Sequence, residues 1–119
     1  MGPVSVSQII TMSGVDIDDF NDNDCEIKRL DYEKYYDYGM FRKGTKTKHG
    51  IIRQVHNSGH IYECMAINGK FCGYGRDLYT KNQYYMGMNK DNNREGQGML
   101  VYSSGKVEQG LWEKGKFKG

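Results

Sequence analysis

The sequence predicts an all-β protein, an antiparallel meander of β-hairpins that repeat along the chain. Three observations favour this fold class: a pattern that recurs at equal spacing from Tyr62 to Tyr85 to Glu108, glycines at fixed places within each copy, and 10 tyrosines among 119 residues. A fixed period of this length is typical of stacked supersecondary units, none of which buries its apolar face alone. Tyrosine favours strands, and periodic glycines mark turns or close backbone approaches.

The repeated glycines keep one register through three copies, and an earlier copy is less regular. The earlier copy runs from Asp37 to Gly59 and matches the others if extra residues are allowed between Gly44 and Gly50. In the later copies we expect turns or tight backbone positions at Gly69, Gly73, Gly75, Gly96, Gly98, Gly105 and Gly115.

The expected strands alternate with turns rich in asparagine and glycine, which tolerate the left-handed backbone of tight hairpins. Residues 24–35 are expected to form one short helix, with Asp24 as its N-cap and Ile27 and Leu30 on one face. An irregular arm is expected before this helix. We expect strands at about 36–43, 50–56, 60–67, 73–79, 83–89, 96–102 and 106–112.

Charge divides the chain into two parts. Residues 1–35 hold eight acidic and three basic side chains, a net charge of −5, and residues 36–119 hold seven acidic and fourteen basic ones, a net charge of +7. We therefore divide the chain into an acidic N-terminal arm, 1–35, and a repeat domain, 36–119, of about three full repeats and a partial one. The arm is expected to contact either the basic face of the repeats or a basic partner.

The spacing within 36–119 resembles the MORN (membrane occupation and recognition nexus) repeat, which runs Tyr-x-Gly-x-Trp/Phe-x-x-Gly-x-x-x-Gly-x-Gly. The best-matching copy comprises Tyr85-Met86-Gly87, Glu95-Gly96-Gln97-Gly98 and Ser104-Gly105-Lys106, continued by 110–119. The departures from the pattern are Asp37 and Glu108 for the tyrosine, Cys64 for a glycine, Asn92 for a turn glycine, and Ala66 and Asn89 for the aromatic residue. The resemblance implies a sheet of stacked hairpins without catalytic activity. Some MORN arrays bind a helical partner peptide in a groove, and others are fused to enzymes.

Aromatic side chains in shared phases of the repeat are the candidate partner-binding residues. Large aromatic residues dominate burial in thin folds, so most of them are expected in the core. A sheet one layer thick also leaves a second face open, and part of the column could line a groove for a partner peptide. The set is Phe41, Tyr62, Tyr79, Tyr85, Tyr102 and Trp112.

A basic run between the first expected strands is the candidate anionic contact. Its side chains Arg42, Lys43, Lys46 and Lys48 either form an ordinary solvated turn or bind an acidic protein or an anionic lipid surface. His49, at the end of this run, is expected at the surface. The net charge of +2 is modest and no nucleic-acid motif is present, so nucleic acid is not an expected partner.

His56, His60, Cys64 and Cys72 are of residue types that bind zinc, but the repeat argues against a zinc site. His56 falls in the column of Tyr79 and Tyr102 and is expected to replace a half-buried tyrosine. His60 falls in an exposed polar column, and Cys64 falls where a small residue is needed. No phosphate-binding loop or nucleophile–base pair stands out. We therefore expect no metal, no cofactor and no catalytic residues.

The expected function is a non-catalytic scaffold or adaptor that docks as a small subunit in a larger protein assembly. No secretory leader is visible, no apolar run approaches the roughly 20 residues of a membrane-spanning helix, and the three cysteines are expected to be thiols in a reducing compartment. The preferred setting is intracellular, in the cytoplasm or cytoskeleton, with the ciliary axoneme suggested by the MORN resemblance. The alternatives are a peripheral phosphoinositide-binding module and a regulatory fragment of an enzyme.

Overall fold

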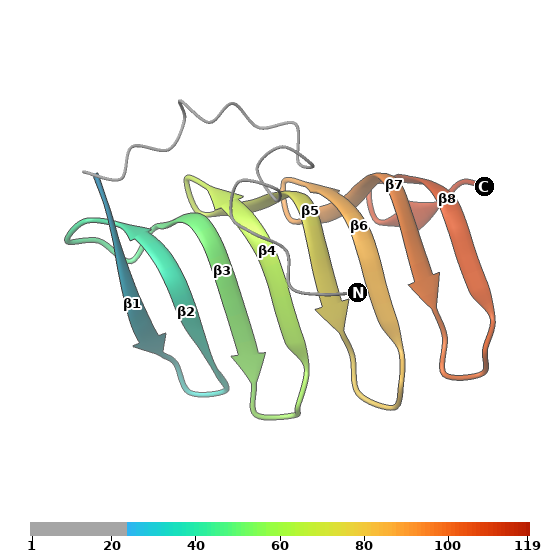
Figure 1. Cartoon of the computed structure of the whole chain (residues 1–119), viewed down its shortest axis with the longest axis horizontal. Coiled ribbons are helices and arrows are strands. Elements are labelled where there is room, and N and C mark those ends of the chain that lie inside the picture. Colours follow the sequence, from blue (N-terminus) through green and yellow to red (C-terminus); the bar gives the residue numbers. More distant parts are fainter. Residues whose placement is uncertain (1–23) are drawn as a thin grey trace.

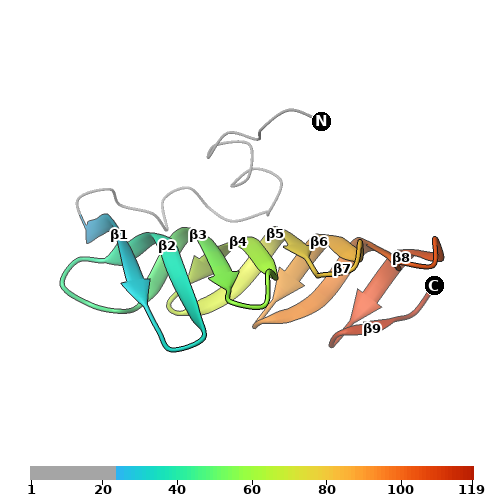
Figure 2. The same cartoon turned by 90° about the horizontal axis from the view of Figure 1, so that it is seen from below.

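The computed structural model describes residues 24–119, which form one antiparallel sheet of nine strands in chain order (Figure 1). This arrangement confirms the predicted all-β fold of successive hairpins. Seen after a quarter turn, the strands follow one another from β1 at one end to β9 at the other (Figure 2). The strands are β1 (Cys25–Asp31), β2 (Tyr35–Arg42), β3 (Lys48–His56), β4 (Ile61–Ile67), β5 (Lys70–Leu78), β6 (Tyr84–Lys90), β7 (Asn93–Val101), β8 (Val107–Glu113) and β9 (Lys116–Phe117).

The predicted helix over 24–35 is wrong, because most of this segment is strand β1. The spacing of Ile27 and Leu30 fits one helical face, but in the strand they point to opposite faces. Leu30 packs against the core, whereas Ile27 is 69% exposed. β1 pairs with β2 from Cys25 to Asp31, so the sheet begins before the expected boundary at 35/36. The rest of the expected acidic arm, residues 1–23, lies outside the described residues.

The strand pairing places equivalent positions of the repeat opposite one another. One cross-strand row, which we call the repeat row, contains the residues that begin each copy. Its members are Asp37, Gln54, Tyr62, Asp77, Tyr85, Leu100 and Glu108. Each repeat is therefore one pair of strands. We call the face that carries this row the inner face and the opposite face the outer face.

A second row explains how a single-layer sheet buries large rings. This glycine row contains Gly39, Ile52, Cys64, Gly75, Gly87, Gly98 and Gly110. A Cβ at Gly98 would lie 2.2 Å from the Tyr85 Oη and 2.6 Å from two carbons of its ring. The Tyr85 ring thus lies along the sheet over bare backbone instead of standing away from it.

The core consists of two clusters on the inner face. The N-terminal cluster contains Phe41, Ile52, Cys64, Ala66 and Phe71, with Leu30 and Tyr62 packed against it. The C-terminal cluster contains Tyr85, Leu100 and Trp112, with Tyr79, Tyr102 and Phe117 packed against it. The rings meet edge to face in both clusters, at 4.7 Å between Tyr62 and Phe71 and at 5.4 Å between Tyr85 and Trp112.

The glycines predicted at turns fall into two physical classes. Gly105, for example, has a φ of +93° and lies in a turn where no atom would contact an added Cβ. Gly98 has no such φ and is required by the close approach of Tyr85. A positive φ also occurs at Gly69 and Gly115 in turns and at Gly73 and Gly96 within β5 and β7, and the second class includes Gly75.

Candidate functional site

The inner face holds a hollow of about 320 Å³, which we call the groove. Tyr62 from the N-terminal cluster and Tyr79 from the C-terminal cluster both line it, so it lies where the two clusters meet. Its remaining lining is polar: Gln54, His60, Asp77, Asn89, Asn92, Asn93 and Arg94, with Gly115. A polar hollow bordered by rings provides both stacking surfaces and hydrogen-bonding groups.

A continuous stack of rings runs beside the groove, at the hairpin turns that join β1 to β2, β3 to β4 and β5 to β6. Successive ring centroids are 4.7, 5.2, 5.1 and 4.7 Å apart, and the planes differ by 15–29°. These distances are close to the separation of neighbouring strands, so one ring per strand is enough to build the stack. We call this stack the ring row; it consists of Tyr32, Tyr35, His56, His60 and Tyr79.

Hydrogen bonds tie the ring row to the repeat row. The His60 Nε2 contacts the Asp77 carboxylate, and the His56 Nε2 lies 2.9 Å from the Gln54 Oε1. The Gln54 amide in turn donates to the Asp37 Oδ1 at 2.9 Å. Burial raises the pKa of the Tyr79 hydroxyl, and Asp77 raises it further. The hydroxyl at the edge of the groove therefore stays protonated and can donate a hydrogen bond.

Asp37 is a fully buried carboxylate in the first copy of the repeat, where later copies carry Tyr62 and Tyr85. Its Oδ2 lies 3.7 Å from the Lys48 Nζ and has no hydrogen-bond partner. A buried charge needs a nearby opposite charge, and Lys48 supplies it. The Lys48 Nζ also lies 5.6 Å from the centre of the Phe71 ring, so Lys48 interacts with residues of the core.

Arg94 is a residue of the groove that the sequence analysis missed. Its guanidinium lies 4.8 Å from the centre of the Tyr85 ring and 5.2 Å from that of Trp112, and it donates to the Tyr79 hydroxyl. Two cation–π contacts and one hydrogen bond thus hold the charge in place. The signal was available, because Arg94 lies midway between Phe71 and Phe117 in the sequence and so occupies an aromatic position of the repeat.

The structure separates the six predicted aromatic residues into two groups. Phe41, Tyr85 and Trp112 are buried in the clusters, where no partner can reach most of the ring. Tyr62, Tyr79 and Tyr102 are half-buried, and the first two line the groove. Of the predicted aromatic residues, only Tyr62, Tyr79 and Tyr102 are therefore accessible enough to contact a partner.

The basic run forms the loop between β2 and β3, and two of its four predicted contact residues already have intramolecular partners. Arg42 donates twice to the Asn68 Oδ1, at 2.7 and 3.1 Å, and Lys48 pairs with Asp37. Lys43 and Lys46 are exposed. The predicted patch is thus reduced to two lysines at the surface.

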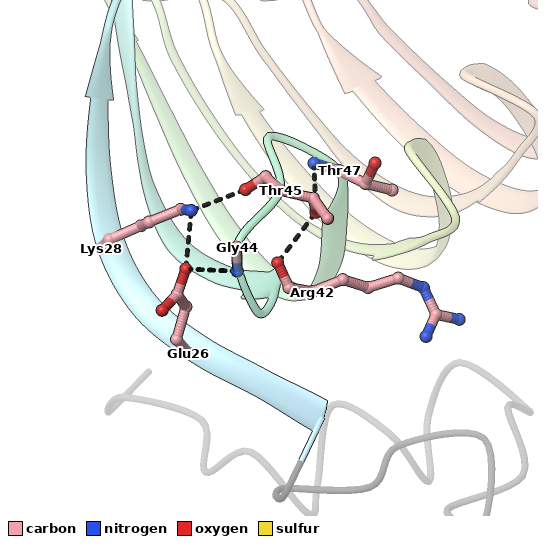
Figure 3. Close-up of polar contacts among 6 residues, drawn as sticks. All are labelled: Glu26, Lys28, Arg42, Gly44, Thr45 and Thr47. Carbon is pink, nitrogen blue, oxygen red and sulfur yellow. Dashed lines mark hydrogen bonds and ion pairs between the residues drawn. The ribbon is translucent and has the colours of Figure 1, made fainter.

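Strand β1 holds this loop through one carboxylate (Figure 3). The Glu26 Oε1 accepts from the Lys28 Nζ at 2.7 Å and from the Gly44 amide at 3.1 Å, and Lys28 also donates to the Thr45 carbonyl. The hydrogen bond from Lys28 lowers the pKa of Glu26, and the bond from Gly44 lowers it further. These hydrogen bonds therefore hold the loop in a fixed position against β1.

The histidine and cysteine residues occupy separate structural roles. His56 lies in the ring row with Tyr79, as its place in the tyrosine column predicts. The expectation of an ordinary exposed position for His60 is wrong, because its ring stacks between His56 and Tyr79 and its side chain is 27% exposed. Cys64 lies in the glycine row, and burial raises the pKa of its thiol to about 12. Among residues 24–119, no three His, Cys, Asp or Glu side chains are grouped so as to hold a metal ion.

The expected surface position of His49 is also wrong, because His49 is 3% exposed. Its Nδ1 accepts a hydrogen bond from the Asn68 amide at 3.2 Å. Asn68 has a positive φ of 48° in the turn between β4 and β5. His49, the second residue of β3, therefore joins this strand to the turn between β4 and β5.

The outer face carries a second hollow, of about 430 Å³, that the sequence analysis did not predict. Methionines from β6 and β7 dominate it, because alternate residues of a strand point to the same face. It is lined by Tyr74, Met86, Met88, Gln97, Met99 and Gln109, together with Gly87 and Gly98.

Comparison with protein-family models and with curated proteins found no match to this chain. In the part of the chain that the structure describes, no helix is long and apolar enough to span a lipid bilayer.

Proposed function

We propose that this protein is a non-catalytic scaffold or adaptor of the MORN-repeat type, which binds a segment of another protein in the groove of its inner face. The observation that carries the proposal is the groove itself, where half-buried rings and polar side chains meet on an open, single-layer sheet. The partner is another subunit of a larger assembly, and the preferred setting is the ciliary axoneme or the cytoskeleton.

The chemistry of the groove suits a polypeptide. Gln54, Asn89 and Asn93 carry amides, which both donate and accept hydrogen bonds as a peptide backbone does. Tyr62 and Tyr79 add half-buried rings, and aromatic residues are the usual anchors of protein interfaces. The opposite charges of Asp77 and Arg94 leave the groove without a strong excess of either sign. A neutral, amide-rich hollow favours a peptide over an anionic headgroup.

The phosphoinositide alternative rests on the basic loop. Arg42 is bound to Asn68 at the surface and Lys48 to the buried Asp37, whereas Lys43 and Lys46 are exposed. Each lysine near an anionic membrane contributes about 1 kcal/mol, so two of them support only weak attachment. The regulatory-fragment alternative has no specific observation in its favour. The proposed contact by the acidic arm concerns residues 1–23, which lie outside the described residues.

The test compares capture of partners by variants altered on opposite faces. Asn93→Arg fills the groove, and Gln109→Arg makes the same chemical change on the outer face. Each tagged variant is incubated with native lysate, and bound proteins are quantified by mass spectrometry. We expect Asn93→Arg to lose most of at least one partner that Gln109→Arg retains. Equal capture by both variants contradicts the proposal.

The membrane alternative is tested in parallel. Wild-type protein and the double variant Lys43→Glu/Lys46→Glu are sedimented with vesicles that contain phosphoinositide. The proposal predicts little sedimentation of either protein at physiological salt. Strong sedimentation of the wild type that the double variant loses would identify the basic loop as the functional site instead.

A further inference from the structure

Arg94 differs from the other arginines of the chain in how its hydrogen-bonding groups are used. The other four each donate to a carboxylate or to a side-chain amide: Arg29, Arg42, Arg53 and Arg76. Arg94 forms no ion pair with any of residues 24–119, and among them it donates one hydrogen bond, to the Tyr79 hydroxyl. A guanidinium has several N–H donors in a planar fork, so most of the donors of Arg94 face the groove without an acceptor from the described chain.

The rings next to Arg94 fix its position without neutralising its charge. The guanidinium lies 4.8 Å from the centre of the Tyr85 ring and 5.2 Å from that of Trp112. A cation is attracted to the face of such a ring, but the ring carries no net charge. Arg94 is half-buried, so it has also lost part of its contact with water. An anion that enters the groove would therefore form a charge-assisted hydrogen bond with a cation already held in place.

The negative charge of the groove already has a partner. The Asp77 carboxylate is contacted by the His60 Nε2. Asp77 also restricts the kind of anion that fits, because like charges close together repel. A ligand with several negative charges would meet Asp77 as well as Arg94, whereas a single carboxylate can be placed at Arg94 alone.

Asn92 supplies a second donor at the same hollow. Its Oδ1 accepts from the Phe71 amide at 2.8 Å, and this bond fixes which end of the side-chain amide is the oxygen. The Nδ2 group has no acceptor among residues 24–119 and remains as a donor. Asn92 and Arg94 both line the groove. A guanidinium and an amide N–H together suit the two oxygens of a carboxylate.

We infer that the segment bound in the groove presents an aspartate or glutamate side chain, whose carboxylate binds Arg94 and Asn92. The inference rests on the proposed function, because it names the chemical group by which the partner segment is recognised. The rings of Tyr62 and Tyr79 remain for the rest of the segment. A lysine in place of Arg94 would keep the charge but could not form the same paired hydrogen bonds.

Selection of short random peptides displayed on phage tests the inference on the whole chain. Each peptide is joined to the display protein at its C-terminal end, so its carboxylates are all aspartate or glutamate side chains. Peptides are kept if they bind the wild type and Gln109→Arg but not Asn93→Arg, which fills the groove. We expect the kept peptides to share an acidic residue at one position.

The outcomes of this selection separate the inference from the proposed function. Groove-dependent peptides that share no acidic residue would overturn the inference and leave the proposed function standing. A selection without any groove-dependent peptide would contradict the proposed function, and the inference with it.

A double-mutant cycle then assigns the acidic residue to Arg94. Replacing it in the peptide by the matching amide should raise the dissociation constant for the wild type by about tenfold or more, because hydrogen bonds to charged groups are strong. The same replacement should change binding to Arg94→Gln by less than about threefold. Arg76→Gln, which removes an arginine of the outer face, should respond as the wild type does. Fluorescence anisotropy gives the dissociation constants, and circular dichroism confirms that each variant is folded.

Two results of the cycle would refute the contact. One is an equal loss of affinity for the wild type and for Arg94→Gln. The other is an unchanged dissociation constant when the acidic residue is replaced, and this result needs the wild type alone. Arg94→Lys provides a further check, because it should bind the acidic peptide more weakly than the wild type and more tightly than Arg94→Gln.

The chain's own aspartates are a competing source of a carboxylate. A variant with asparagine at four positions of the acidic arm removes it: Asp16, Asp18, Asp19 and Asp22. The inference predicts that this variant and the wild type bind the selected peptides with the same affinity. Markedly tighter binding by the variant would assign Arg94 to a carboxylate of this chain and overturn the inference.

Discussion

The N-terminal and C-terminal clusters fill the same rows of the sheet in different ways. In the C-terminal cluster the repeat row contributes Tyr85, and Gly87 and Gly98 leave space for its ring. In the N-terminal cluster the glycine row carries Ile52 and Cys64, whose side chains occupy that space. In one cluster a ring lies over the bare backbone of the glycine row, and in the other Ile52 and Cys64 fill that row and pack with Phe41 and Phe71.

The comparison shows that the two rows are coupled. Tyr85 of the repeat row lies flat over Gly87 and Gly98, whereas Tyr62, which has Cys64 beside it, is only half-buried. Where Ile52 occupies the glycine row, the repeat row carries the buried Asp37, supported by Gln54 and Lys48. Where one row departs from the repeat pattern, the other row thus departs from it as well.

Truncation of an aromatic core residue should cause the largest loss of stability in either cluster. Trp112→Ala removes a ring that is 3% exposed and donates to the Gly98 carbonyl, and Phe41→Ala removes one that is fully buried. Each should lower the free energy of unfolding by about 3–5 kcal/mol, measured by urea denaturation. A loss below about 1 kcal/mol for Trp112→Ala would show that the C-terminal cluster does not stabilise the sheet.

Added methyl groups in the glycine row should distinguish the clusters. Gly98→Ala places a Cβ 2.2 Å from the rigid Tyr85 ring, whereas Gly75→Ala places one 2.8 Å from the smaller Cys64 thiol. Overpacking costs about 1–3 kcal/mol, and we expect Gly98→Ala near the upper end and Gly75→Ala near the lower. The measurement is again urea denaturation, and the reverse order would contradict the coupling of the two rows.

Much of this fold was predictable because the repeat consists of residues, glycine and tyrosine above all, that strongly favour particular local backbone conformations. The strands β2–β8 follow from glycine and tyrosine spacing, and the exact equivalence of His56 and Tyr79 followed from their shared column. β1 was missed because a charged edge strand has no strong alternation of apolar and polar residues. Asp37 was missed as a core residue because its burial depends on partners that only the strand register brings together, whereas the place of Arg94 in the column of Phe71 and Phe117 could have identified it.

His49→Ala should have a measurable effect, contrary to the expectation for a surface residue. The substitution leaves the Asn68 amide without its acceptor, and loss of one partner from a buried hydrogen bond costs about 1–3 kcal/mol. Lys46→Ala, an exposed change in the loop just before β3, should stay within about 0.5 kcal/mol. Equal urea midpoints for the two variants would place His49 outside the cooperative core.

Alkaline pH should weaken both clusters, and this is the smallest expected effect. Burial raises the pKa of the Cys64 thiol from 9.0 and that of the Tyr85 hydroxyl from 10.0, each to about 12. Because the folded state holds both protons more tightly, their contribution is complete below about pH 9 and is lost as pH rises toward 12. The melting temperature should therefore fall between about pH 8 and about pH 10.5, and fall less in Cys64→Ala. An identical fall in that variant would exclude Cys64 as a source.

Site-specific photo-crosslinking in native lysate tests most directly whether the inner face is the binding face. Benzoylphenylalanine replaces Tyr79, which lines the groove, or Tyr38, which is 52% exposed on the outer face. Both replacements exchange a tyrosine for the same reactive ring. The account predicts a defined cross-linked partner from position 79 and none from position 38. The same partner from position 38 alone, or equally from both positions, would contradict it.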